Sequence, residues 1–248
     1  MSTLLKIKNK SDTSAEIYIS GDIVDDAEGD FLSNAWGVEN GYEWPSKIKQ
    51  QLDSLKGKDL TIYINSDGGM VSAGVAMANM IARHDGHTTA IVDGWCCSIA
   101  TQIFFSADAR KMPSNAYLMI HKPTVSVSGD ANAMRKAAEI LDVLQDGLET
   151  TYRKAAREDV ADDYIHDLVN VETWFTGEEA AKIFDIDVLD PSDAVACAGK
   201  RPLNFFKAPK DLHFSARDKP SDVDIVDNHV DKCKAEVALA LAKGAIAK

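Results

Sequence analysis

The 248-residue sequence lacks any long hydrophobic run. No segment reaches the ~20 consecutive apolar residues that a membrane-spanning helix requires. Residues 1–16 also lack the apolar core of a secretory signal peptide. We therefore expect a cytoplasmic protein without a membrane partner.

Cysteine is scarce, and its spacing forms neither a disulfide framework nor a paired C-x-x-C zinc pattern. The four cysteines are Cys96, Cys97, Cys197 and Cys233. His84 and His87 form an H-x-x-H pattern, but no second pair of ligands accompanies them. We expect these histidines on an exposed loop after a helix, and we predict no metal and no cofactor.

Basic residues are too few to balance the acidic ones. The chain has 27 Lys and Arg against 39 Asp and Glu, a net charge of −12. A nucleic-acid-binding protein needs a basic surface, so nucleic acid is not an expected partner. Residues 199–248 carry a net charge of +3, which leaves −15 on residues 1–198. This shift predicts a main domain over 1–198 and a linker with a helical tail over 199–248.

The main domain alternates predicted strands with predicted helices. The strands are Glu16–Ile19, Leu60–Ile64, Thr88–Val92, Tyr117–Ile120 and Asp187–Leu189. The helices follow Pro45, cover Ser72–Arg83, begin near Ser98, and cover Asp130–Arg157, Asp162–Val169 and Gly177–Phe184. Loops are expected at Ser20–Asp30 and Asn34–Pro45. This order predicts βαβ crossovers, hence an α/β fold with a largely parallel sheet buried on both faces.

The helix predicted over Asp130–Arg157 is unusually long. At 1.5 Å per residue it would extend ~42 Å, more than a small domain needs. We expect one end to project and to pair with another subunit.

Three short segments could carry chemistry. The first is Asn65–Gly69, where two glycines after a strand let backbone N–H groups approach a ligand. The second is Ser98, expected at the N-terminus of an apolar helix, where developing negative charge is stabilised. The third is His121, at the end of an apolar strand. Each alone is equally typical of a turn, a helix cap or a packed histidine. Together they would meet at the carboxyl edge of a parallel sheet, where α/β proteins place their sites.

The order of these segments resembles the ClpP family of serine peptidases. INSDGG at 64–69, GWCCS at 94–98 and MIHKP at 119–123 correspond to approximate family patterns NSPGG, G-x-A-A-S and MIHQP. The segment 171–180, with ETWFT followed by E-A, is similar to ClpP-related head maturation proteases of phages and prophages. The resemblance covers roughly 15–192. It implies a ClpP/crotonase-like spiral of ββα units with a long handle helix after the histidine.

The resemblance also implies the site. Ser98 would be the nucleophile, His121 its general base and Glu172 the acid, in the place of the family's aspartate. The backbone N–H groups of Gly69 and Ile99 would form the oxyanion hole. Asp167 is the nearest alternative acid.

Two departures from the family pattern lie beside these residues. Asp67 replaces the usual proline, and we expect it to face solvent rather than the oxyanion. Cys96 and Cys97 replace small residues before Ser98. A cysteine nucleophile is an alternative, but neither cysteine aligns with the serine position, and buried cysteine behaves as a small apolar residue.

The partners implied are polypeptide substrates and further copies of the chain. The resemblance implies a homo-oligomeric ring, with a heptamer and a stacked double ring as forms to expect. It also raises capsid or scaffold proteins, an AAA+ unfoldase, and a location in the bacterial host cell or a phage prohead. The alternatives are a non-catalytic ring subunit and a crotonase-type acyl-CoA enzyme.

Overall fold

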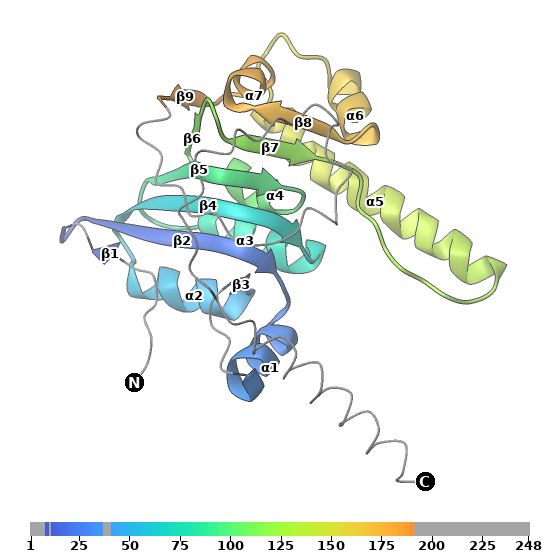
Figure 1. Cartoon of the computed structure of the whole chain (residues 1–248), viewed down its shortest axis with the longest axis horizontal. Helices are drawn as coiled ribbons and strands as arrows, with labels where there is room; N and C mark the ends of the chain where they lie inside the picture. Colours follow the sequence, from blue (N-terminus) through green and yellow to red (C-terminus); the bar gives the residue numbers. More distant parts are fainter. Residues whose placement is uncertain (1–7, 10, 37–40, 191–248) are drawn as a thin grey trace, which may run out of the picture. The chain divides into compact units, whose positions relative to one another are not determined.

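A computed structural model describes residues 8–9, 11–36 and 41–190 (Figure 1). The predicted boundary after residue 198 and the tail 199–248 lie outside the described residues, so both stay predictions. Within the described ranges, no helix is both long and apolar enough to cross a lipid bilayer.

One mixed sheet organises the described part of the chain, and most of its strands are parallel. The strands are β1 Lys8–Asn9, β2 Ser14–Ile23, β3 Tyr42–Glu43, β4 Asp59–Gly69, β5 Thr88–Cys97, β6 Ala109–Pro113, β7 Tyr117–Ile120, β8 Thr173–Thr176 and β9 Asp187–Leu189. The main order is β1-β2-β4-β5-β6-β9, with β3 beside β2, and with β7 between β5 and β8. The pairs β1–β2 and β7–β8 are antiparallel, and the other pairs are parallel. The predicted α/β class with a largely parallel sheet is confirmed.

Helices connect the strands. They are α1 Asp26–Trp36, α2 Pro45–Ser54, α3 Val71–Ala82, α4 Ala100–Phe105, α5 Ala131–Ala155, α6 Asp162–Asn170 and α7 Gly177–Ile183. α3 joins β4 to the parallel β5, and α4 joins β5 to the parallel β6, which are the predicted βαβ crossovers. α3 packs on α2 and α4, and α4 packs on α5, so these helices form one continuous layer.

The core lies between this helical layer and one face of the sheet. In β4 the apolar Leu60, Ile62 and Ile64 are buried, whereas the intervening Thr61 and Tyr63 are only partly buried. The expectation that both faces are buried is therefore wrong for this strand. The second face carries polar side chains, and the rings of Tyr18 and Tyr63 stack there with centroids 4.9 Å apart. The Tyr63 hydroxyl donates to Glu16 at 3.0 Å.

The loop predicted over Ser20–Asp30 is also wrong. β2 continues to Ile23, and α1 begins at Asp26. The acidic residues that suggested a loop stabilise a helix N-terminus: the Asp25 carboxylate accepts from the backbone N–H of Glu28 at 2.8 Å. The second predicted loop, Asn34–Pro45, contains the end of α1 and the short strand β3.

The long helix is present as α5, slightly shorter than predicted. Asp130 caps it, because its carboxylate accepts from the N–H groups of Asn132 and Ala133 at 3.0 Å. Its C-terminal half buries Gln145, Leu148, Glu149 and Tyr152, among others. Its N-terminal half extends away from the sheet (Figure 1).

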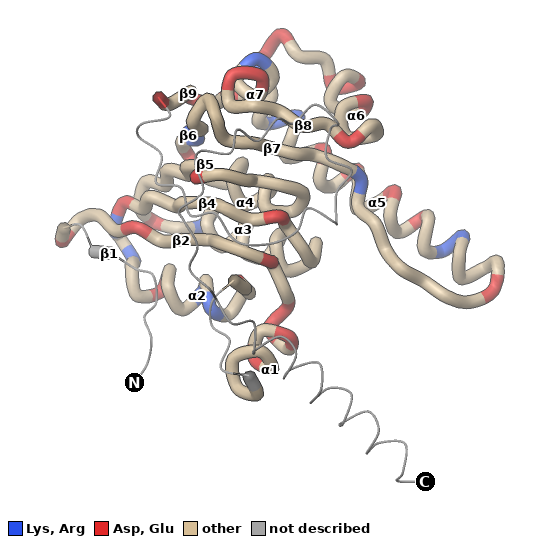
Figure 2. Tube along the Cα trace, viewed as in Figure 1, with Lys and Arg blue, Asp and Glu red and all other residues tan. Residues whose placement is uncertain are grey.

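Most acidic residues in the described part of the chain are exposed or partly exposed, whereas Glu16, Glu43, Asp93 and Glu149 are buried. Figure 2 shows acidic residues on α1, α5, α6 and α7 and near the ends of β2 and β4. This distribution fits the net charge of −15 carried by residues 1–198.

Candidate active site

Strand register brings the three predicted site residues to one edge of the sheet. In the β5–β7 pair Cys97 lies beside Met119, and in the β7–β8 pair Ile120 lies opposite Thr173. Ser98 and His121 each follow one of these paired residues, and Glu172 precedes Thr173. The three side chains are therefore neighbours because their strands are paired, although they are far apart in sequence.

Ser98 and His121 are in direct contact. The Ser98 Oγ and His121 Nε2 atoms are 2.7 Å apart, a short hydrogen bond. The other ring nitrogen, Nδ1, lies 4.0 Å from Glu172 Oε2. A proton on Nδ1 would face the carboxylate and would leave Nε2 to accept the Ser98 hydroxyl proton. This arrangement can turn a serine hydroxyl into a nucleophile.

The environment favours a neutral His121. Burial lowers the pKa of His121 below its ordinary value, and the negative charge of Glu172 opposes this shift. The side chain of His121 is 18% exposed, so the ring is shielded but still reachable. A neutral imidazole at neutral pH is the form that can accept a proton.

The Glu172 carboxylate lies within ion-pair distance of His121. Its side chain is 31% exposed, and its Oε1 accepts a long hydrogen bond of 3.4 Å from Trp174 Nε1. Asp167, the alternative acid, is exposed on α6. The 4.0 Å separation from His121 exceeds a hydrogen bond.

Two of the predicted site residues have an unusual backbone conformation. Among the described residues, Ser98 and Glu172 are the non-glycine residues with positive φ, each at 55°. The left-handed region is costly for residues with a Cβ, and it persists only where the surrounding structure enforces it. Such strain is concentrated at functional sites in proteins, and here it coincides with the nucleophile and the acid implied by the sequence.

Backbone hydrogen bonds hold Ser98 in this strained conformation. Its N–H donates to Met119 O at 2.9 Å, and its carbonyl accepts from the Thr101 hydroxyl at 2.6 Å and from the Thr101 N–H at 3.0 Å. The N–H of Ser98 already donates to Met119 O, so it is not the donor for an oxyanion. The next N–H along the chain belongs to Ile99. This order fits the predicted role of Ile99 as an oxyanion donor, which stays a prediction.

The two glycines of β4 have separate close contacts. A Cβ on Gly68 would lie 2.7 Å from Ser98 Cβ, and one on Gly69 would lie 2.1 Å from Ile23 O. Gly68 therefore permits the close approach to Ser98, and Gly69 permits the approach to β2. The predicted oxyanion role of the Gly69 N–H remains a prediction, supported by its position next to Gly68.

The cysteines before Ser98 are buried. Cys96 and Cys97 are both 0% exposed, and burial raises the pKa of each thiol well above its ordinary value. A protonated, inaccessible thiol is a poor nucleophile, which opposes the cysteine alternative. Asp67 is partly exposed, and its negative charge adds to the raised pKa of Cys97.

His84 and His87, the H-x-x-H pair, have different partners. His84 Nε2 bonds to Lys58 O at 2.8 Å, whereas His87 Nδ1 lies 3.6 Å from Asp108 Oδ2. Each histidine therefore belongs to a separate local contact at the surface.

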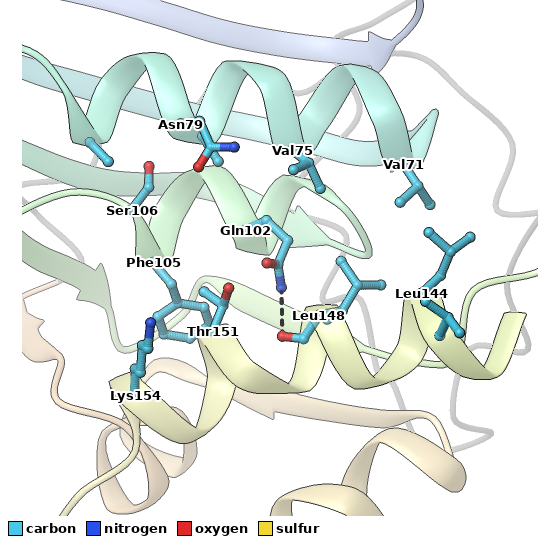
Figure 3. A pocket seen from close by; sticks show the side chains of 14 residues that line it. Val71, Val75, Asn79, Gln102, Phe105, Ser106, Leu144, Leu148, Thr151 and Lys154 are labelled. Atoms are coloured by element: carbon cyan, nitrogen blue, oxygen red, sulfur yellow. Dashed lines mark hydrogen bonds between the residues drawn. The ribbon is translucent and has the colours of Figure 1, made fainter. Parts of the chain in front are cut away.

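A pocket of about 590 Å³ lies between α3, α4 and α5 (Figure 3). Val71, Val75, Leu144 and Leu148 contribute apolar side chains, and Gln102 donates to Leu148 O at 3.2 Å. Two lining residues are close in sequence to the predicted site: Val71 is two residues after Gly69, and Gln102 is four residues after Ser98. An apolar side chain of a ligand could enter here. Val75 is 36% exposed at the pocket.

Sequence reasoning missed three residues that shape the site. Asn65 Oδ1 accepts from Trp95 N at 3.1 Å, which ties the end of β4 to β5. Ser66 Oγ donates to Gly21 O at 2.6 Å and accepts from Gly68 N at 3.1 Å. Trp174 donates to Glu172. A signal existed for all three, because each stands within a segment already singled out, at 64–69 or 171–180.

Comparisons with known proteins agree with this geometry. A family model described as Clp protease matches residues 40–187. Proteolytic subunit 2 of the ATP-dependent Clp protease of Bifidobacterium longum is 28% identical over 137 residues, which cover 53% of this chain and 64% of the relative. Proteolytic subunit 1 from Protochlamydia amoebophila is 28% identical over 165 residues, covering 63% of this chain and 77% of the relative. The Streptococcus agalactiae subunit is 29% identical over 136 residues, covering 53% of this chain and 68% of the relative.

The family match covers more than half of the chain and includes Ser98, His121 and Glu172. The sheet order, the handle helix α5 and the clustered site residues are consistent with the fold that the sequence predicted. The chain belongs to the Clp protease family of ClpP-like peptidases.

Proposed function

We propose that this chain is a serine endopeptidase that hydrolyses peptide bonds through Ser98, His121 and Glu172. The observation that carries the proposal is the 2.7 Å contact between Ser98 Oγ and His121 Nε2, formed by a serine with φ of 55°. A serine that only capped a helix would need neither the histidine nor the strained backbone.

The chemistry follows from these positions. Ser98 Oγ attacks the substrate carbonyl carbon while His121 takes the hydroxyl proton. The N–H groups of Ile99 and Gly69 stabilise the negative oxygen of the tetrahedral intermediate, a contribution typically worth ~3 kcal/mol per donor. As the C–N bond breaks, His121 gives the proton to the leaving amine. In the second half of the reaction, His121 takes a proton from water, and the water oxygen attacks the acyl-enzyme carbonyl carbon. The bond to Ser98 Oγ then breaks as His121 returns the proton to Ser98.

Two other functions compete with this one. A crotonase-type acyl-CoA enzyme would use backbone donors without a serine–histidine pair, so the contact between Ser98 and His121 favours the peptidase. A non-catalytic ring subunit is favoured only by the 4.0 Å gap between His121 and Glu172. That gap leaves the serine–histidine pair intact.

A fluorophosphonate probe, which reacts covalently with activated serines, tests the proposal on the full chain. We expect labelling of the wild type, and none of Ser98→Ala or His121→Ala. The controls Ser114→Ala and His84→Ala change the same residue types away from the site and should label normally. An assembled, folded wild-type protein that shows no Ser98-dependent labelling would rule out the peptidase.

For the substrate, we propose polypeptides with an apolar side chain next to the cleaved bond. The pocket lined by Val71, Leu144 and Leu148 supports this preference. A fluorogenic peptide library varied at that position, with Ser98→Ala as the blank, should show leucine or methionine above aspartate; the reverse order would contradict the preference. The finer substrate class, capsid or scaffold proteins, is supported by the ETWFT segment and is tested by cleavage of purified phage structural proteins.

For assembly, we propose a ring of identical subunits joined partly through α5. The handle exposes Met134 at 41%, Ile140 at 51% and Val143 at 72%, an apolar surface that a second copy would cover. Sedimentation analysis should give a large closed oligomer; a monomer at high concentration would contradict it. The relatives are named as subunits of ATP-dependent proteases, so an ATPase partner is proposed for this chain as well.

A further inference from the structure

We propose that Trp174 is a positioning residue for this reaction, because its indole N–H holds the Glu172 carboxylate in the orientation that faces His121. The inference rests on the proposed peptidase function and assigns a role to a residue outside the serine, histidine and acid.

The two oxygens of Glu172 have different neighbours. Oε1 accepts the hydrogen bond from Trp174 Nε1 at 3.4 Å, and Oε2 faces His121 Nδ1 at 4.0 Å. The side chain is 31% exposed, so solvent competes for the carboxylate. A donor on one oxygen limits rotation of the carboxylate and leaves the other oxygen toward the histidine.

Trp174 can act in this way because its own ring is held firmly. Its indole packs edge-on against Trp95, with centroids 5.2 Å apart and planes at 84°. Trp95 in turn lies 6.1 Å from the ring of Tyr117. The three aromatic residues come from β8, β5 and β7, and the register places Trp174 beside Met119. Edge-on aromatic pairs have a preferred geometry, so the N–H direction is fixed by the sheet.

The orientation of Glu172 affects the base directly. The negative charge of Glu172 raises the pKa of His121 against the effect of burial. A carboxylate that rotated toward solvent would interact less with the ring, because screening by water weakens the attraction. The pKa of His121 would then fall further. The positioning contact should therefore be visible in the pH dependence of the reaction.

The experiment measures the second-order rate of Ser98 labelling by the fluorophosphonate probe as a function of pH, using the full chain. Trp174→Phe removes the indole N–H and keeps an aromatic ring against Trp95. Trp95→Phe is the matched control, because it shrinks the same ring pair and leaves the Trp174 N–H in place. Two charged residues near the site, Asp67 at the end of β4 and Lys122 in the loop after β7, are unchanged in every variant.

We expect Trp174→Phe to slow labelling about fivefold, or ~1 kcal/mol, because the 3.4 Å contact is long and partly exposed and should contribute no more than an ordinary hydrogen bond. The acid limb of its pH profile should move to lower pH, while Trp95→Phe keeps the wild-type limb. In a Glu172→Gln background, Trp174→Phe should have no further effect on the limb. A Trp174→Phe profile that matches the wild type, or a shift that persists without the Glu172 charge, overturns the inference.

Two measurements keep this result separate from other causes. If the wild-type protein shows no Ser98-dependent labelling, the proposed peptidase function fails. That failure would be independent of any change at Trp174. If Trp174→Phe does not fold by circular dichroism, benzothienylalanine at position 174 deletes only the N–H and preserves the ring shape. Wild-type labelling by that protein at every pH contradicts the role of Trp174.

Discussion

Two glutamates near α6 differ sharply in their surroundings. Glu149, on α5, is 0% exposed; its carboxylate accepts from Gln145 Nε2 at 2.7 Å, from Arg153, and lies 3.0 Å from His166 Nδ1 on α6. Glu172, which follows α6, is 31% exposed and has contacts of 3.4 and 4.0 Å. The first carboxylate is saturated with close partners, and the second is not.

The difference indicates two uses of the same side chain. A buried carboxylate must be fully paired, because an unpaired charge in the interior is very unfavourable. Glu149 thus links α5 to α6 as a structural element. Glu172 keeps a loosely held oxygen toward His121, which suits a group that must respond when an imidazolium forms. Glu172 also has a positive φ, so its backbone conformation lowers the stability of the folded chain.

The largest effect is expected at Glu149. Glu149→Gln keeps the shape but removes the charge that Arg153 and His166 face, and it should lower the free energy of unfolding by about 2 kcal/mol. The value is below that for a fully buried pair because Arg153 is 30% exposed. Urea unfolding measures it.

Asp142→Asn is the control, since this residue is exposed on the same helix and should change stability by less than ~0.5 kcal/mol. Equal losses for the two variants would contradict a structural role for Glu149.

At Glu172 we expect the opposite profile. Glu172→Gln should leave the unfolding free energy nearly unchanged and slow Ser98 labelling about tenfold, or ~1.4 kcal/mol in the barrier. The reaction needs neutral His121, whose pKa is lowered by burial and raised by the Glu172 charge. Without that charge the pKa falls further, neutral His121 persists to lower pH, and the acid limb moves in that direction. A limb that stays in place, measured over the same pH range, would remove Glu172 from the site.

The sequence allowed prediction of Glu172 but not of Glu149. Ser98, His121 and Glu172 lie in short segments whose order identifies the family, and the β5, β7 and β8 register then brings them together. The predicted bounds of β7 and β9 match the structure: β7 is a short apolar run, and the Val-Leu pair of β9 stands directly before an Asp-Pro pair in the sequence. The Glu149 network depends on how α5 packs on α6, which no local pattern specifies.

The errors have physical causes as well. The start of α1 falls within the loop predicted over Ser20–Asp30, because its acidic first turn resembles solvated chain, although Asp25 caps the helix. The polar second face of β4 was missed because Thr61 and Tyr63 are compatible with burial in a strand. The positive φ of Ser98 and Glu172 has no signature in residue type, since neither is glycine or asparagine.

The smallest expected effect is the difference in stability between a glycine and an alanine variant, which should have opposite signs at the two glutamate positions. At position 172, where φ is 55°, Glu172→Gly should be more stable than Glu172→Ala by about 1 kcal/mol, because glycine has no Cβ to oppose the left-handed backbone. At position 149, in the middle of α5, Glu149→Gly should be less stable than Glu149→Ala by about 1 kcal/mol, since glycine is the poorer helix former. Urea unfolding of the four variants measures both differences. Both Glu172 variants should label slowly, so the more stable glycine protein would be no more active. The same sign at both positions would mean that the backbone at Glu172 is not strained. The positive φ of Glu172 could then not be explained by a requirement to position its carboxylate.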